Sequence, residues 1–298
     1  FIAETKCVNG VEVSAAYDID FKKAADFVVD HDVPEVFRDH EVLLSHVDAV
    51  YIASPHLSHY DYIRNALENK KHVLCETPMV LEANQAKEMY RLAEQHGVLL
   101  MHCPAFNHLM TMIKSGLIGE VVDVEASLSK LWKQPDLREL DKIQGGGSMY
   151  ELGSYPLLPI IKLLGVEYEN LNLYSRIENG VDVYTKGVLR YKQAIGTFKL
   201  GLGMKTEGNL VISGTEGYAY VPAPWWKTDY FEFRYEDQNC NKKFFYKWDG
   251  DGLRYEIQEF ISCIVNNRFS SARLRRRESV AMAGIMQNFT ERKNFFEI

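Results

Sequence analysis

The first hundred residues alternate between short apolar runs and segments with apolar residues at helical spacing. The apolar runs, which predict strands, cover residues 11–17, 47–54, 71–76 and 98–102. The segments between them, which predict helices, cover residues 21–31, 60–69 and 82–96. In the last helix Ala86, Met89 and Ala93 recur at i, i+3 and i+7, and Gly97 is typical of a helix end. Strands that alternate with such helices indicate a doubly wound α/β domain with a parallel sheet.

The pattern changes after residue 103. Between Val122 and Ser129 apolar and polar residues alternate strictly, which predicts a strand with one buried and one solvent-facing side. Further strand-like runs cover residues 168–177, 181–191, 194–202, 209–213, 218–222, 229–236 and 243–248. Helices are predicted at residues 109–115, 155–164, 254–266 and 277–290, and a hairpin turn at 214–217. We therefore expect two domains, residues 1–103 and 104–298, the second an α+β unit with a mostly antiparallel sheet.

Composition excludes several classes of protein. Of the 298 residues, 46% are apolar and 25% are charged, which is ordinary for a soluble globular protein. A net charge of −7 gives no reason to expect a nucleic acid or an anionic membrane as partner. No apolar run approaches the ~20 residues of a membrane span, and we expect no secretory leader. The five cysteines are widely spaced without a Cys-x-x-Cys motif, so we expect free thiols, no metal site and a cytoplasmic location.

The segment that says most about function is Lys71–Pro78, where an apolar strand ends in Cys-Glu-Thr-Pro before a helix. Ligands of open α/β sheets bind where strands end and the next helices begin. The segment resembles the Glu-Lys-Pro signature of the Gfo/Idh/MocA oxidoreductases, the family of glucose–fructose oxidoreductase, inositol dehydrogenase and dimeric dihydrodiol dehydrogenase. In that family the Lys is the usual catalytic residue, and Thr77 takes its place here. The resemblance implies that Glu76 and Thr77 contact the cofactor near the nicotinamide ribose.

A second candidate segment lies at the end of the predicted strand 47–54. It comprises Ser54, Pro55 and His56, and His59 follows three residues later. The segment resembles the turn after the fourth strand of the family, where backbone and side chains touch the ribose and pyrophosphate. The resemblance implies that these four residues bind the cofactor. The alternative is an ordinary strand that ends at a proline before a helix.

A Rossmann unit has a glycine-rich turn, a helix, and a second strand that ends in an acid ~20 residues beyond the glycines. Asp18 is the candidate acid, and its carboxylate would favour NAD over NADP by accepting hydrogen bonds from the ribose hydroxyls. Asp20 competes for this role, and either residue is also a candidate helix N-cap before Phe21. Residues 1–103 contain no Gly-x-Gly-x-x-Gly, so we expect the first strand and phosphate loop to precede Phe1.

The link after Met101 is also several residues shorter than in the family resembled. Either the sequence at hand omits both segments, or the chain is a naturally shortened paralogue. The first explanation is favoured because a doubly wound sheet without its central first strand should not be stable.

The segment Gly145–Pro156 is the second strong match. It resembles the family's Gly-Gly-Gly…Asp-x-Gly-x-Tyr/His motif, which opens a helix under the nicotinamide. Tyr155 takes the position of the proton donor, and Glu151 replaces the usual Asp. A phenol, whose unperturbed pKa is ~10, needs a nearby cation to exchange protons at neutral pH, and Thr77 cannot supply one. The alternative is a loop that caps a helix, with Tyr155 buried against the sheet.

Two further segments carry candidate binding residues. The corner Pro222–Lys227 contains Trp225 and Trp226, which could stack on a sugar ring, and Lys227, which could hold an anionic group. The favoured alternative there is a packed loop or an oligomer contact. The basic run Arg273–Arg277 is expected to be a solvated turn.

The combined hypothesis is an NAD(P)-dependent oxidoreductase that transfers hydride between the nicotinamide and a sugar, cyclitol or related polyol. NAD is the expected cofactor, NADP the less favoured one, and Tyr155 the proton donor. We expect a homodimer or homotetramer formed through the free face of the antiparallel sheet. The alternatives are a non-catalytic dinucleotide-binding sensor of the same fold, which Thr77 favours, and a structural subunit without cofactor.

Overall fold

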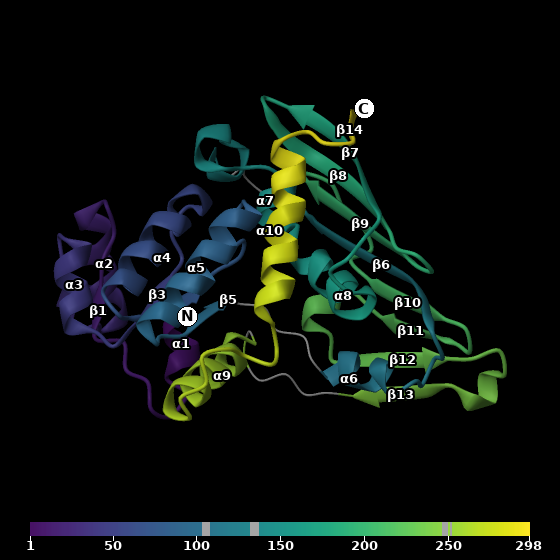
Figure 1. Ribbon diagram of the computed structural model, residues 1–298, viewed down its shortest axis with the longest axis horizontal. Coiled ribbons are helices and arrows are strands. Elements are labelled where there is room, and N and C mark those ends of the chain that lie inside the picture. Colours follow the sequence, from purple (N-terminus) through teal and green to yellow (C-terminus); the bar gives the residue numbers. More distant parts are fainter. Residues whose placement is uncertain (103–107, 132–136, 246–249, 251) are drawn as a thin grey trace.

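The computed structural model describes all residues except 103–107, 132–136, 246–249 and 251. Short parallel strands and their helices form one side of the molecule, and a large twisted sheet forms the other (Figure 1). Helix α10 (Arg276–Thr290) runs between the two parts and packs against α5 (Ala83–His96) on one side and α8 (Ser154–Leu164) on the other.

The first part has the predicted parallel pairing. Strands β3, β4 and β5 form one parallel sheet in that order, and β1 pairs in parallel with β2 in a second, smaller sheet. The strands are β1 (Ala15–Ala16), β2 (Glu35–Val36), β3 (Ala49–Ile52), β4 (His72–Cys75) and β5 (Leu100–His102). The other helices of this part are α1 (Ile2–Thr5), α2 (Phe21–His31), α3 (His40–His46) and α4 (His59–Glu68).

Sequence reasoning missed β2 and α3, and it made β1 too long. Helix α3 begins at an Asp39 cap, whose side chain accepts a hydrogen bond from the Glu41 amide at 2.8 Å. The helix has seven residues, which is too short for an apolar period to stand out. Helix α2 matches the predicted range because Asp20 caps its start and the chain turns into a left-handed residue, Asp32, at its end.

Both faces of the β3–β4–β5 sheet are covered. Val73 and Leu100 pack in a cluster with α4 and α5, whereas Leu74 and Met101 face the opposite side. On that side they meet Ile257 and further residues of α9 (Leu253–Val265), a helix from the end of the chain. The sheet therefore completes its core with a segment about 150 residues away, and the domain division expected after residue 103 stays a prediction.

The second part is a nine-stranded sheet with the order β13-β12-β11-β10-β6-β9-β8-β7-β14. Neighbours are antiparallel except β6 with β9 and β7 with β14, so the predicted mostly antiparallel sheet is confirmed. The strands are β6 (Val121–Lys130), β7 (Asn170–Glu178), β8 (Val181–Arg190), β9 (Ile195–Leu202), β10 (Leu210–Gly214), β11 (Tyr218–Val221), β12 (Tyr230–Arg234), β13 (Lys242–Phe245) and β14 (Phe295–Glu297). The predicted hairpin turn joins β10 to β11, with the Gly214 amide 2.8 Å from the Gly217 carbonyl oxygen.

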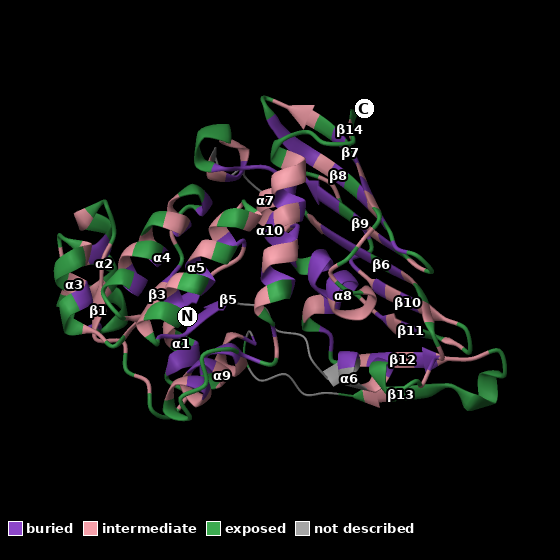
Figure 2. Ribbon diagram, viewed as in Figure 1, coloured by how far each residue is buried: buried purple, intermediate pink, exposed green. Residues whose placement is uncertain are grey.

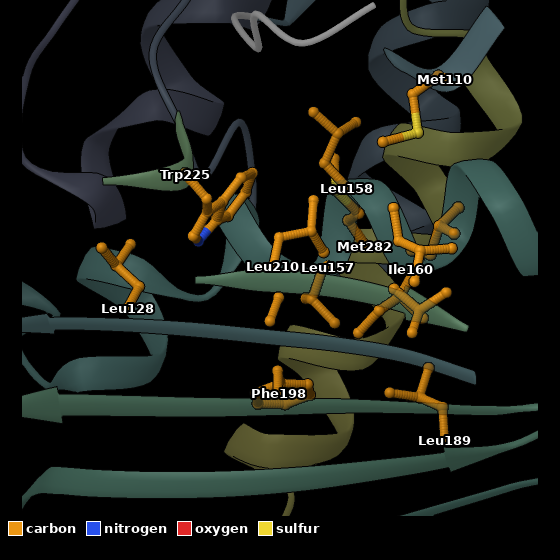
Figure 3. Packing of buried hydrophobic residues seen from close by; sticks show 14 of the residues in the cluster. Met110, Leu128, Leu157, Leu158, Ile160, Leu189, Phe198, Leu210, Trp225 and Met282 are labelled. Atoms are coloured by element: carbon orange, nitrogen blue, oxygen red, sulfur yellow. The ribbon is translucent and has the colours of Figure 1, made fainter. Parts of the chain in front are cut away.

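Helix α8 packs on β6 and β9 at one face of this sheet, and α10 packs on α8 (Figure 1). Leu157 and Ile160 of α8 pack over Phe198 and Leu189 of the strands in the main core cluster (Figure 3). Along most of β7 and the first part of β9, buried residues alternate with partly or fully exposed ones, as expected for a sheet with one buried face (Figure 2). The remaining helices of this part are α6 (His108–Lys114) and α7 (Ser148–Leu152). No helix among the described residues combines the length and the apolar composition that a membrane span requires.

Candidate functional site

Two of the sequence motifs lie side by side because β3 and β4 are parallel neighbours. Ile52 pairs with Cys75, so the chain leaves both strands at the same edge of the sheet. His59 joins the two turns that follow. Its Nε2 lies 2.8 Å from the carbonyl oxygen of Ser54, and its Nδ1 lies 2.9 Å from that of Pro78. The turn expected to hold the ribose and the turn of the Cys-Glu-Thr-Pro motif are therefore one connected unit.

The environment of His59 argues against the direct cofactor contact that the sequence suggested. The side chain is 1% exposed, and both ring nitrogens face backbone carbonyl oxygens. Burial lowers the pKa of His59 below its usual value, although the two carbonyls and the Glu76 carboxylate favour the charged form. His59 is thus a buried link between two turns.

Glu76 is held in place from the neighbouring strand. The Tyr51 hydroxyl of β3 donates a hydrogen bond to one carboxylate oxygen of Glu76, and the Thr77 amide lies 3.3 Å from the other. The Thr77 hydroxyl oxygen is buried and has no hydrogen-bond partner among the described residues. A buried hydroxyl without a partner is costly, which marks this strand end as a place where a ligand group would be stabilising.

The glycine-rich segment meets the first of these turns. His56 Nδ1 lies 3.3 Å from the Gly145 carbonyl oxygen and 3.7 Å from Glu151 Oε1. Arg138 donates to the other Glu151 oxygen at 3.1 Å. Burial lowers the pKa of His56 to about 4, so the ring is neutral at pH 7 and its one proton suits the Gly145 carbonyl. His56 of one predicted motif is therefore in contact with Gly145 and Glu151 of the other. Arg138, which no motif predicted, also contacts Glu151.

Tyr155 stands in the first turn of α8, and its side chain is 40% exposed. The alternative in which this phenol is buried against the sheet therefore does not hold. The preceding residue, Ser154, lines a narrow pocket together with residues that follow β4 and residues of α10. The lining comprises Pro78, Met79, Val80, His102, Ser154, Ser279, Met282, Ala283 and Met286. The start of α8 thus lies against the end of β4, as the two motifs require.

His102 is a residue of this pocket that sequence reasoning missed. It ends β5, is 3% exposed, and has Nδ1 3.3 Å from the Ser279 hydroxyl oxygen of α10. Its Nε2 has no partner within the described part of the chain. Burial lowers the pKa of His102 to about 3, so this histidine is neutral at neutral pH. The link after Met101 that the sequence suggested to be short lies outside the described residues.

The two candidate acids after β1 have separate roles. Asp20 is the N-cap of α2 and accepts a hydrogen bond from the Lys22 amide at 3.1 Å. Asp18 is exposed and accepts a hydrogen bond from the Asp20 amide at 2.8 Å. The N-cap alternative therefore applies to Asp20, whereas Asp18 does not cap the helix and its carboxylate is also exposed.

The tryptophan corner corrects one expectation. Trp225 is 1% exposed, and its indole N–H donates to the Ser127 carbonyl oxygen at 3.0 Å. A ring enclosed in the core cannot stack on a substrate, so Trp225 is a packing residue (Figure 3). Trp226 packs perpendicular to it at a ring distance of 6.0 Å, and Lys227 is exposed. Substrate contacts by Trp226 and Lys227 stay predictions.

Other candidate ligands are scattered. The described part of the chain holds no group of three or more His, Cys, Asp or Glu side chains that could bind a metal ion. Four cysteines are free thiols, and Cys103 lies outside the described residues. The four are Cys7, Cys75, Cys240 and Cys263.

Comparison with known proteins identifies the family. Residues 2–103 match the oxidoreductase family with an NAD-binding Rossmann fold, and residues 106–220 match the GFO/IDH/MocA C-terminal domain. The chain belongs to the GFO/IDH/MocA oxidoreductase family. The resemblance and the fold class inferred from the sequence are thereby confirmed.

Relatives of this family cover most of the chain. The trans-1,2-dihydrobenzene-1,2-diol dehydrogenase of Oryctolagus cuniculus is 28% identical over 93% of this chain and 88% of its own length. The enzyme of the same name from Xenopus tropicalis is 24% identical over 90% and 85%. All of the relatives named here are enzymes, so the alternative of a non-catalytic sensor gains no support from them.

Solved structures share the fold. A 3-ketoreductase from Actinomadura kijaniata, in complex with NADP and TDP-benzene, superposes with a TM-score of 0.84 at 22% identity, covering 100% of this chain and 94% of its own. A levoglucosan dehydrogenase in complex with NADH and levoglucosan gives a TM-score of 0.81 at 17% identity, covering 94% and 87%.

Three features of the described residues suit a dinucleotide. The Thr77 hydroxyl, which has no partner among these residues, follows β4, and the exposed Asp18 carboxylate follows β1. The His56 turn lies between them along the chain and is fixed by Gly145 and Glu151. Sequence reasoning missed Tyr51, Arg138 and His102 because their contacts are non-local. For Tyr51 and His102 the one available signal was a polar residue in or at the end of a predicted buried strand, and Arg138 carried no such signal.

Buried histidines should make the fold sensitive to acid. Between pH 6.5 and about 4 for His56, or about 3 for His102, the unfolded chain binds protons that the folded chain excludes. Stability supplied by the neutral rings is therefore complete above pH 6.5 and is lost as the pH falls through this window. Asp123 and Asp182 act in the opposite direction, because burial raises the pKa of each to about 6.

We therefore predict that His102→Gln lessens the loss of unfolding free energy between pH 7 and pH 5 by about 2 kcal/mol, on the scale of ~1.4 kcal/mol per pH unit for one group. Urea unfolding at the two pH values measures this difference. The matched control is His31→Gln at an exposed position, which should reproduce the wild-type difference. Equal pH dependence in wild type and His102→Gln would contradict the prediction.

Proposed function

We propose that this family member transfers hydride between the nicotinamide of NAD(P) and a hydroxyl-bearing carbon of a sugar, cyclitol or related polyol. The observation that carries the proposal is the contact of His56 with both Gly145 and Glu151, which joins the cofactor turn to the segment that carries Tyr155. Relatives and neighbours named for a dihydrobenzenediol, a ketoreductase and levoglucosan support a substrate of this class.

The roles follow from the positions. The bound cofactor supplies or accepts the hydride at its nicotinamide ring. The cofactor would be held by Asp18, Ser54, Pro55, His56 and Glu76. His59 would not touch it but would link the two turns through the carbonyl oxygens of Ser54 and Pro78. Tyr155 would exchange the proton of the substrate oxygen, and the Thr77 hydroxyl would hydrogen-bond that oxygen. Glu151, oriented by Arg138 and His56, would fix the turn before Tyr155.

This arrangement lacks a positive charge at residue 77, where the side chain is the neutral Thr77. A phenol with a pKa of ~10 is a poor proton exchanger at neutral pH unless a cation favours its ionised form. A positioned acid or base contributes about 10²–10⁴-fold in rate, so the hydroxyl of Thr77 leaves this part of the barrier largely unassisted. We infer slow turnover of simple polyols.

We predict that Thr77→Lys raises turnover of polyols by about tenfold or more, since an ammonium near Tyr155 would stabilise developing negative charge in a water-poor site. Steady-state rates across a panel of polyols with NAD and NADP measure this gain. Tyr155→Phe in the Thr77→Lys background should abolish it, because the two groups act as one unit.

Thr77→Ser is the matched control, because it alters the same position and adds no charge. If cofactor binds and Thr77→Lys turns over no faster than wild type, the missing lysine is not what limits the chemistry. A dinucleotide sensor would then be the better description of the chain.

We also propose that NAD is preferred over NADP, since the Asp18 carboxylate would repel a 2′-phosphate. The solved neighbours include one with NADP and one with NADH, so the family fold accommodates both. Calorimetric titration should give a lower Kd for NAD than for NADP in the wild type. In Asp18→Asn the ratio of the Kd for NADP to the Kd for NAD should be smaller. Asp20→Asn, which retains a helix cap, should keep the wild-type ratio. Tighter NADP binding by the wild type would show the assignment to be wrong.

A homo-oligomer through the outer face of the nine-stranded sheet is a further part of the proposal. Tyr174, Ile195 and Phe296 are 37%, 43% and 49% exposed on this face, where Tyr174 and Phe296 stack at 5.1 Å. Such apolar groups on a sheet face are buried when two sheets pack.

The free thiols of the described residues support a reducing compartment such as the cytoplasm.

Light scattering at micromolar concentration should therefore show a dimer or tetramer, and Ile195→Asp should shift it towards a mass near 34 kDa. Val265→Asp, at a 73% exposed position of α9, provides the control and should leave the mass unchanged. A wild-type monomer under these conditions would rule out the proposed interface.

A further inference from the structure

Asp182 of β8 makes a set of contacts that the proposed chemistry does not use. We propose that Asp182 is a positioning residue that holds the Gly145–Gly147 turn and the start of α7 against the large sheet. Through this hold it would set the position of Glu151 and of Tyr155. The role in catalysis rests on the proposed function, whereas the hold on the loop does not.

One carboxylate oxygen carries the contact. Asp182 Oδ2 accepts hydrogen bonds from the Ser148 hydroxyl at 2.5 Å, the Met149 amide at 2.9 Å and the Thr185 hydroxyl at 2.7 Å. Two of these donors belong to the first turn of α7, 33 and 34 residues away in the chain. First-turn amides have no partner within their own helix, and Asp182 supplies the acceptor that an N-cap side chain normally provides.

Gly147, the residue before α7, explains why the acceptor comes from another element. It has no side chain, and its φ of +116° lies in the region that disfavours L side chains. A Cβ on Gly147 would lie 2.2 Å from Asp182 Oδ1. The absent Cβ is therefore what lets the carboxylate approach the start of the helix.

The other side of Asp182 is anchored in the sheet. The Ser175 hydroxyl of β7 is 2.8 Å from the Thr185 hydroxyl of β8, which in turn donates to Asp182. Ser175 and Thr185 are cross-strand partners and are both 0% exposed. This buried chain of hydrogen bonds ties the Asp182 carboxylate to β7 as well as to its own strand β8.

The burial of Asp182 is costly, which supports a positional role. The side chain is 2% exposed, and burial raises its pKa to about 6 although its three donors oppose this. An apolar side chain at this inward position would avoid the cost but could not hold Ser148 and Met149.

The geometry of the site depends on where α7 begins. Glu151, one turn further along α7, meets His56 and Arg138, and α8 with Tyr155 begins directly after Gly153. The residue before α7 is tied as well, because the Gly147 amide donates to the Glu139 carbonyl oxygen at 2.8 Å. Loss of the Asp182 contact would release the first turn of α7, which follows this tie, and a displacement of ~1 Å can cost about 10²-fold in rate.

The test compares Asp182→Ala and Asp182→Asn with Ser175→Ala, which removes a hydroxyl from the same buried network without touching the loop. Hydrogen–deuterium exchange of residues 145–153 reports the hold directly, and kcat and KM report its consequence. We expect faster exchange in this segment and a kcat lowered by about 10²-fold in Asp182→Ala. Asp182→Asn, which keeps one acceptor oxygen, should be intermediate, and Ser175→Ala should stay within about threefold of the wild-type kcat.

Unchanged exchange at residues 145–153 in Asp182→Ala would overturn the proposal. So would a loss of kcat no greater than that of Ser175→Ala at equal loss of stability, because the residue would then be merely structural. If Asp182→Ala does not fold, Asp182→Asn and Gly147→Ala, which disturbs the contact from the loop, decide the question by the same readouts.

Failure of the proposed function is distinguishable from failure of this inference. A wild type that binds no dinucleotide, combined with faster exchange in Asp182→Ala, would refute the oxidoreductase site but leave the hold on the loop established.

Discussion

The parallel pairing of β3 with β4 is the constraint on which the site depends. Because Ile52 and Cys75 lie in register, both turns that follow leave the sheet at one edge, within reach of a single side chain. His59 uses this proximity, with one ring nitrogen at each turn. A slip of one residue would send each side chain to the opposite face, so the register also decides that Tyr51 reaches Glu76.

A three-stranded parallel sheet cannot keep this register alone, since parallel sheets need cover on both faces. Helices α4 and α5 provide one layer and are local in sequence. The other layer is α9, whose Ile257 and Phe260 pack on Leu74 and Met101. Helix α10 then fills the space between α5 and α8, and its Ser279 reaches His102 at the end of β5. Helix α9 therefore covers the second face of the parallel sheet, and α10 connects the first part of the fold to the helix that packs on the nine-stranded sheet.

Sequence patterns foretold what is local. The period of α5 and the turn at Gly214 each depend on neighbouring residues, and each was found where the pattern placed it. The cap of α2 was expected at Asp18 or Asp20, and it is Asp20. Motif resemblance assigned His56 and Glu151 to one site, and the structure shows the contact between them, which neither the motifs nor any periodicity predicted. The roles of Arg138 and Asp182 could not be predicted from the sequence. Arg138 is 13 residues from its partner Glu151, and Asp182 is 34 residues from its partner Ser148. A single polar residue also has many possible uses. Trp225 misled for a related reason: a tryptophan after prolines suits a sugar platform or a core equally well, and only the Ser127 carbonyl decides between them.

The replacement of the family lysine by Thr77 separates two things that such a site must do. Holding the turn after β4 is the task of Tyr51, Glu76 and His59, and all of their contacts are made without a cation at residue 77. Stabilising charge on a reacting oxygen is a different task, and it depends on what faces the ligand. Arg138 lies 3.1 Å from Glu151, so its charge is largely matched by that carboxylate. His56 is kept neutral by burial. Neither can replace an ammonium beside Tyr155 without breaking the contacts that position the segment. The contacts that hold the turn after β4 are thus made independently of residue 77, whereas assistance to proton transfer in the proposed reaction would depend on it. Binding and turnover are therefore expected to respond separately to changes at residue 77.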